Sequence, residues 1–283
     1  MKAPRQRLAL DPPPAARALA AFVLAVTILV SLAPFFYVVS TSLKETKSLF
    51  GYPPHWIPDP IYFGNYLALF QKHPFGWWLL NTLAISGIIA ALKLVIDGMA
   101  AYALAKLDFA GKGAIVAMLL ASVAVPLAAL LIPLFLITRS MGLIDTRLAL
   151  ILPPLANPLG VFMIRAFIVG LPDELIHSAR LDGAGEFEIF RRIVAPLIRP
   201  GLVVHATFIF AYQYTSFLWP LVAVRDLNKQ VLTVGISSLR AIFTVDWGLI
   251  SAASLVAAVP LTVIFILFQQ AFFHQGLAGA LKE

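Results

Sequence analysis

Residues 171–202 read LPDELIHSARLDGAGEFEIFRRIVAPLIRPGL and form the longest charge-rich interval between two strongly apolar segments of the chain. The pattern predicts two short helices joined at Asp182-Gly183 and closed by Pro196 and Pro200. Gly183 permits a backbone turn that a side chain would resist. Residues 171–200, here called the helical loop, therefore have the pattern of an ordered contact surface rather than of a simple connection.

Both predicted helices of the helical loop are amphipathic. Asp173 follows a proline and can cap the first helix. The apolar face of that helix holds Leu175, Ile176 and Ala179. The second helix, about residues 184–194, offers Phe187, Phe190 and Ile193. Physical chemistry alone leaves two interpretations open: the helices lie on lipid headgroups, or they contact a partner protein.

The composition indicates that lipid is the solvent for most of the chain. Hydrophobic residues make up 60% of the 283 residues and charged residues only 12%, with a mean hydropathy of +0.90. A soluble domain of this size needs far more surface charge. The net charge of +7 comes from basic residues at segment ends, which is typical of anchors facing anionic lipid and not of a nucleic-acid-binding stripe. The absence of cysteine excludes disulfide scaffolds and cysteine-based zinc sites.

Six segments are long and apolar enough to cross a membrane as helices, because a span needs about 20 apolar residues. They are residues 16–39, 79–104, 113–137, 148–169, 202–224 and 249–273. Several contain prolines, which predict kinks. The predicted architecture is an all-α membrane protein with a tail at 1–15, a six-helix domain at 16–273 and a tail at 274–283.

Basic residues before the first span predict its orientation. Lys2, Arg5, Arg7 and Arg17 place the N-terminus in the cytoplasm, and six spans return the C-terminus to the same side. The first apolar run is too long for a cleaved signal peptide, so we expect an uncleaved anchor. Trp77 and Trp78, at the start of the second span, are expected to be interfacial anchors.

The helical loop resembles the "EAA" loop of ABC-importer permeases in its order Leu-Pro-x-Glu-Leu, Ala-Arg-x-Asp-Gly-Ala and Ile-x-x-Pro-x-x-x-Pro. His177-Ser178-Ala179 stands where the family has Glu-Ala-Ala. The resemblance implies the type I importer permease fold and implies that the loop forms cytoplasmic coupling helices seated on an ATPase. It assigns this coupling role to His177, Ser178, Ala179, Asp182, Gly183, Ala184, Ile193, Pro196 and Pro200, and to Gly276 and Gly279 of the tail.

Further motifs resemble the carbohydrate branch of this family, which includes the maltose and glycerol-3-phosphate permeases. They are Ser40-Thr41-Ser42-Leu43-Lys44, Ala100-Ala101-Tyr102-Ala103-Leu104-Ala105, Gly142-Leu143-Ile144-Asp145-Thr146 and the tail from Gly276 to Lys282. The resemblance implies a subunit of the bacterial inner membrane that imports a sugar or sugar-like solute. Its implied partners are a second permease in a heterodimer, two ATPase subunits that carry ATP and Mg, and an extracytoplasmic solute-binding protein.

The fifth predicted span is unusually polar and aromatic. Its candidate solute-pathway residues are Tyr212, Gln213, Tyr214, Thr215, Ser216 and Trp219. Aromatic faces with hydroxyls and amides suit a sugar, but the same residues also suit interfacial packing, and both interpretations stay open. Lys93 and Asp97 lie one turn apart in the second span, as a neutral structural pair or as a functional one.

The sequence contains no phosphate loop, no clustered metal ligands and no nucleophile paired with a base. We therefore expect a transport subunit that does not hydrolyse ATP and holds no cofactor itself. An ion-coupled secondary carrier that uses Lys93 and Asp97 is the alternative, disfavoured by the lack of inverted-repeat signs.

Overall fold

A computed structural model of the chain describes residues 13–52, 55–240 and 245–280, with side chains described as far as residue 269. The regular structure of these residues is helical, and their only β pairing is an isolated bridge between Arg240 and Val245. The chain divides into two compact units. One comprises residues 1–68 with 246–255, and the other comprises residues 69–245 with 256–283.

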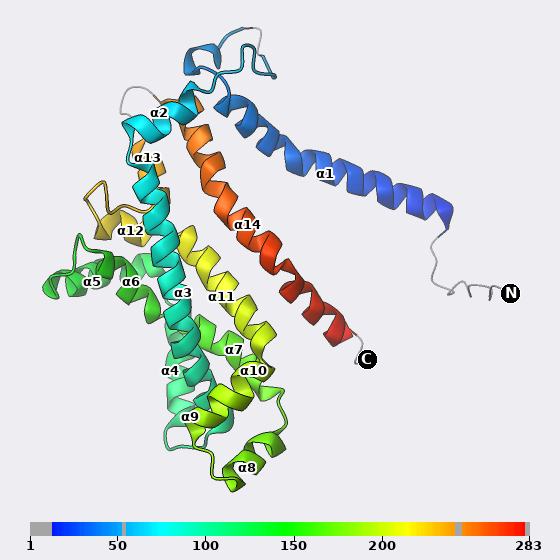
Figure 1. The fold of residues 1–283 in the computed structure, drawn as a ribbon, viewed down its shortest axis with the longest axis vertical. Coiled ribbons are helices and arrows are strands. Elements are labelled where there is room, and N and C mark those ends of the chain that lie inside the picture. Colours follow the sequence, from blue (N-terminus) through cyan, green and yellow to red (C-terminus); the bar gives the residue numbers. More distant parts are fainter. Residues whose placement is uncertain (1–12, 53–54, 241–244, 281–283) are drawn as a thin grey trace. The chain divides into compact units, whose positions relative to one another are not determined.

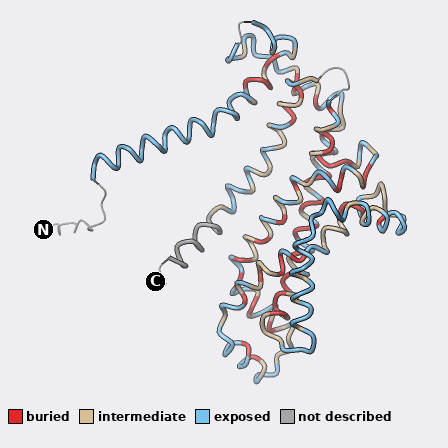
Figure 2. Tube along the Cα trace, turned by 180° about the vertical axis from the view of Figure 1, so that it is seen from behind, coloured by how far each residue is buried: buried red, intermediate tan, exposed pale blue. Residues whose placement is uncertain are grey.

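The first unit contains α1 (Pro14–Ser42), a short 3₁₀ helix (Thr46–Ser48) and the first turns of α2 (Gly64–Lys72) and α14 (Trp247–Ala280). α1 is exposed along nearly all of its length, and only its last turn, Ser40–Ser42, is buried (Figure 2). Asn65 fixes this end, because its side-chain amide donates to the carbonyls of Ser42 and Lys44 at 2.8 Å each. An apolar helix this exposed is expected of a segment that faces lipid.

In the part of the chain that the structure describes, three helices are long and apolar enough to cross a membrane alone: α1, α3 (Phe75–Lys106) and α14. Three bent pairs pass the same test of length and composition, which gives up to six spans. The pairs are α4 (Lys112–Ala124) with α5 (Leu127–Ser140) at 103°, α6 (Arg147–Leu155) with α7 (Leu159–Val169) at 45°, and residues 186–197 with α11 (Arg199–Tyr214) at 85°. The six predicted spans agree with this count when each bent pair is taken as one span.

Prolines explain two of the three bends. Pro126 is the N-cap of α5, and the preceding Val125 is extended (φ −81°, ψ 118°) because a residue before proline is disfavoured in the α region. Pro158 is the N-cap of α7, and Asn157 supplies the first acceptor when its Oδ1 receives the amide of Leu159 at 2.9 Å. The predicted kinks at these two prolines are therefore full breaks in the helix.

The fifth predicted span, residues 202–224, is wrong as a continuous helix. α11 ends at Tyr214, and the chain restarts only as α12 (Leu218–Ala223). The break is local side-chain chemistry, since the Thr215 hydroxyl donates back to the carbonyls of Ala211 (3.0 Å) and Tyr212 (3.3 Å). Hydroxyl side chains that bond to nearby backbone compete with the helix in this way.

α3 is the central helix of the second unit. α11, α7, α6 and α13 (Leu232–Ser238) all pack against it, and the buried residues concentrate along these contacts (Figures 1 and 2). Toward Phe75, apolar residues of α3, α6, α11 and α12 form one cluster. Toward Lys106, a second cluster joins α3 and α7 to α8 (Asp173–Leu181) and α9 (Glu186–Ile189). The helical loop is thus built onto one end of α3.

Candidate functional site

The helical loop has the two helices that its sequence predicts. α8 ends in a Schellman motif, in which the Gly183 amide donates to Arg180 O and the Ala184 amide to Ala179 O, both at 3.0 Å. Gly183 has φ +83°, the left-handed conformation that favours glycine. The second helix is α9, continued by a π-helical turn (Phe190–Val194) and by α10 (Ala195–Leu197).

One carboxylate binds the two helices of the loop to each other and to α3. Glu186 Oε1 accepts from Arg180 Nε at 2.7 Å, and its Oε2 accepts from the Tyr102 hydroxyl at 2.5 Å. The hydrogen bond from Arg180 lowers the pKa of Glu186 below its ordinary value. The sequence interpretation missed Glu186, although an acidic residue at the start of a helix is a recognisable signal.

Lys106, the last residue of α3, holds the start of α8 in place. Lys106 Nζ donates to Leu171 O at 2.7 Å and to Asp173 Oδ1 at 2.5 Å. This bond lowers the pKa of the Asp173 carboxyl. The prediction that Asp173 caps α8 is wrong, because Pro172 is the N-cap and the carboxylate turns to Lys106 instead.

Exposure divides the predicted coupling residues into three groups. His177, Ser178, Asp182, Gly183, Pro196 and Pro200 are exposed, Ala184 and Ile193 are half-buried, and Ala179 is buried. Large apolar side chains are also exposed beside them, with Leu181 at 89% and Phe187 at 62%. Leu175, expected on the buried face, is exposed, and Ile176 is buried. Gly276 and Gly279 lie in the part of α14 whose side chains are not described.

The intramembrane pair Lys93–Asp97 is fully buried and belongs to a larger cluster. Lys93 Nζ lies 3.1 Å from Asp97 Oδ1 and donates to the carbonyl of Asn157, at the α6–α7 break, at 2.6 Å. His205 of α11 is 0% exposed, and its Nε2 lies 3.1 Å from Asp97 Oδ2. We call Lys93, Asp97 and His205 the charge cluster. The charge cluster joins α3 to α11 and, through the Asn157 carbonyl, to the segment between α6 and α7.

Gly160 of α7 packs closely against Asp97 and His205 of the charge cluster. A Cβ at this position would lie 2.0 Å from Asp97 Oδ2 and 2.2 Å from His205 Cε1. Nothing larger than glycine fits there without displacing a buried polar group. The sequence interpretation missed both Gly160 and His205.

The polar residues of the fifth predicted span do not converge on one site. Tyr214 and Trp219 are buried and bonded within the chain, the Tyr214 hydroxyl to Ala257 O (2.7 Å) and the Trp219 indole to Ala149 O (2.8 Å). Tyr212 is 49% exposed and stacks on Phe208, Thr215 is exposed, and Gln213 and Ser216 are intermediate. Tyr212 and Thr215 are therefore the exposed members of this set.

Comparison with known proteins identifies the family. Residues 98–277 match the family described as binding-protein-dependent transport system inner membrane component. The chain is 34% identical over 257 residues to an arabinooligosaccharide transport permease of Bacillus subtilis, covering 90% of this chain and 92% of that one. The chain belongs to this family.

Other relatives agree with this assignment. A sulfoquinovosyl glycerol transport permease of Agrobacterium fabrum is 32% identical and is matched over 92% of this chain and 93% of its own. The structure of a bacterial ABC transporter that imports alginate superposes with a TM-score of 0.81 at 19% identity, covering 92% of this chain and 98% of that one. The latter likeness supports the fold, namely that of an importer permease.

Membership fixes the kind of subunit. The chain is a transmembrane permease of an ATP-driven, binding-protein-dependent importer, it is integral to the inner membrane, and ATP hydrolysis belongs to separate ATPase subunits. The resemblance drawn from the helical loop is confirmed. The alternative of an ion-coupled carrier finds no support in these relatives.

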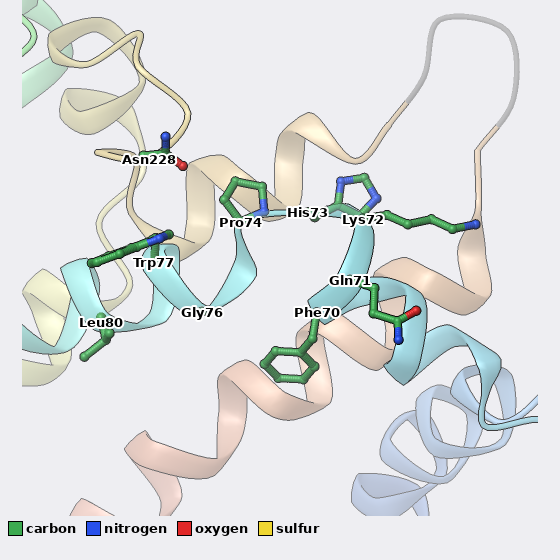
Figure 3. Close-up of a pocket in the computed structure, with 9 residues that line it drawn as sticks. All are labelled: Phe70, Gln71, Lys72, His73, Pro74, Gly76, Trp77, Leu80 and Asn228. Atoms are coloured by element: carbon green, nitrogen blue, oxygen red, sulfur yellow. The ribbon is translucent and has the colours of Figure 1, made fainter.

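A hollow of about 640 Å³ lies where α2 meets α3. It is lined by Phe70, Gln71, Lys72, His73, Pro74, Gly76, Trp77, Leu80 and Asn228. Figure 3 shows the labelled side chains pointing in different directions, with Lys72 and Gln71 away from Trp77, so no set of polar groups converges.

Trp77 is 54% exposed as expected of an anchor, but Trp78 is buried and donates to Leu227 O at 2.7 Å.

Proposed function

We propose that this permease imports an oligosaccharide or another sugar-like solute and pairs with a second, different permease subunit. Support comes from the substrates named for its relatives, which are arabinooligosaccharides, sulfoquinovosyl glycerol and trehalose. These solutes share a surface of hydroxyls around apolar C–H faces. Exposed Tyr212, with Thr215 beside it, offers an aromatic face and a hydroxyl for such a surface.

We propose further that the helical loop is the contact with the ATPase, with both chain termini on the same cytoplasmic side. The observation that carries this proposal is the turn at Gly183, beside Leu181, which is 89% exposed. An apolar side chain that exposed on a charged, braced element has the character of an interface anchor. The bonds from Arg180 and Tyr102 to Glu186 hold the turn in place before any partner binds.

Two glycines in the same turn provide the test of coupling. Gly183 and Gly185 both have open space around a Cβ, but only Gly183 has a positive φ. We expect Gly183→Val to abolish ATP-driven uptake at normal membrane abundance, since a β-branched residue is strained in that conformation. Gly185→Val is the control and should keep most of the uptake. Normal uptake by Gly183→Val would refute the assignment of the coupling site.

A pull-down of the tagged chain from detergent-solubilised native membrane tests the assembly and the solute. Mass identification should find a second permease, an ATPase with a phosphate loop and a solute-binding protein. A thermal-shift screen of that binding protein against sugars then names the solute. Recovery of this chain as its own partner would refute the heterodimer, and a binding protein stabilised only by non-sugars would refute the substrate class.

A further inference from the structure

The buried charge cluster lies on the path between the helical loop and the centre of the permease. α11 begins at Arg199, and a single residue, Ile198, separates it from the end of α10. The ring of Phe167 packs closely against Gly201 in the first turn of α11. His205 follows six residues after Arg199, about 9 Å along the helix at 1.5 Å per residue. Any displacement of the loop that α11 transmits therefore reaches His205 early.

The two oxygens of Asp97 face different partners, a lysine of its own helix and a histidine of α11. Oδ1 lies 3.1 Å from Lys93, which is itself bonded to the Asn157 carbonyl, and Oδ2 lies 3.1 Å from His205 Nε2. The Oδ2 contact is close, but it lacks the alignment of a hydrogen bond, so Asp97 Oδ2 and both ring nitrogens of His205 are buried without a hydrogen-bond partner. The joint to α6–α7 thus includes a hydrogen bond, whereas the joint to α11 is a close polar contact between Asp97 Oδ2 and His205 Nε2.

Burial makes this joint consequential. Lys93, Asp97 and His205 are each 0–1% exposed, so separation of α3 from α11 would leave a carboxylate oxygen facing apolar surroundings. Gly160 packs against the contact from α7, closely enough that a Cβ there would clash with both Asp97 and His205. The contact between Asp97 and His205 therefore links the movement of α3 to that of α11 more strongly than apolar packing alone would.

We propose that His205 is a positioning residue for transport: through Asp97 it makes α3 follow α11 when the helical loop moves. This inference rests on the proposed coupling role of the loop. His205 needs no contact with solute or nucleotide for this task. A purely structural histidine would support assembly alone, whereas a positioning histidine also sets the distance between α3 and α11.

The natural absence of cysteine allows a direct test by spin labelling. Leu92 on α3 and Phe208 on α11 are 41% and 38% exposed, so Leu92→Cys and Phe208→Cys accept labels without opening the core. The distance between the labels is measured by pulsed electron resonance in the purified complex, without nucleotide and with ADP-vanadate. A complex with the unsubstituted chain corrects for labels on partner subunits.

We expect one narrow distance distribution in the parent pair, unchanged by nucleotide. His205→Leu should broaden it and allow a shift of about 2 Å with nucleotide, the size of a typical helix displacement. His205→Gln, which places an amide nitrogen near the position of Nε2, should restore the narrow distribution, and His205→Asn, which is too short, should not. The Gln and Asn variants decide the matter if the Leu variant does not assemble.

The width without nucleotide tests the joint independently of the coupling proposal, which only the nucleotide arm addresses. Equal widths in the parent, Gln and Asn pairs would overturn the inference. A parent pair that separates with nucleotide would overturn it as well. Broadening in Asn but not in Gln, with no response to nucleotide in any pair, would support the joint and count against the coupling role of the loop.

Discussion

Replacing Gly160 with alanine tests the packing of the charge cluster with a single methyl group. The added Cβ would lie 2.0 Å from Asp97 Oδ2 and 2.2 Å from His205 Cε1, far inside van der Waals contact. Either α7 retreats or Asp97 moves away from its partners. Overpacking costs about 1–3 kcal/mol, and breaking a buried ion pair costs about 3–5 kcal/mol. We expect a loss of about 3 kcal/mol in the free energy of unfolding, where these two ranges meet.

The assay is the thermal unfolding midpoint of the purified complex. At about 2–4 °C per kcal/mol for a chain of this order of size, Gly160→Ala should lower Tm by about 6–12 °C. Gly87 in α3 is the matched control, because a Cβ there has nothing within 4 Å. Gly87→Ala should leave Tm unchanged or raise it, since alanine favours the helix by about 0.5–1 kcal/mol. Equal midpoints for the two variants would refute the close packing of α7 on Asp97.

Two further predictions concern the hydrogen bonds of the second unit. Glu186→Gln should increase amide hydrogen exchange in residues 181–190 at pH 7. Folding lowers the pKa of the Glu186 carboxyl, so the carboxylate stabilises the fold above the ordinary pKa of 4.5, and this stabilisation is lost as the pH falls through the lower folded value. The difference in exchange between variant and parent at matched pH should therefore shrink below pH 4.5. Tyr214→Phe should destabilise the permease by about 1 kcal/mol, because it removes the buried hydrogen bond from the Tyr214 hydroxyl to the Ala257 carbonyl. Tyr212→Phe should leave Tm unchanged, and equal effects of the two changes on Tm would contradict the inward placement of Tyr214.

The sequence predicted those features that depend on neighbouring residues. Apolar length located α1, α3 and α14, and prolines marked the breaks before α5 and α7. Gly183 was expected at the turn for its backbone freedom, and it has φ +83° there. The end of α11 at Tyr214 was missed, since hydropathy does not record that a threonine hydroxyl will bond to the preceding turn.

Only part of the candidate site could be predicted from the sequence, because many of its contacts join residues that are far apart in the sequence. Lys93 and Asp97 were visible as an i,i+4 pair, but His205 lies 108 positions after Asp97 and Gly160 lies on another helix. A lone histidine in an apolar span carries no sign of its partner. The same holds for Tyr102 and Glu186, whose bond spans 84 residues.

Lys93 and Asp97 do not form a self-sufficient pair. A self-sufficient pair would need no other polar contact, yet Lys93 also binds the carbonyl of Asn157, which the break at Pro158 leaves without a helical partner. Asp97 in turn approaches His205. The proline break and the buried lysine therefore account for each other: the break exposes an acceptor within the membrane, and the ammonium satisfies it. The aspartate then balances the charge and turns its second oxygen to α11, the helix that leads to the helical loop.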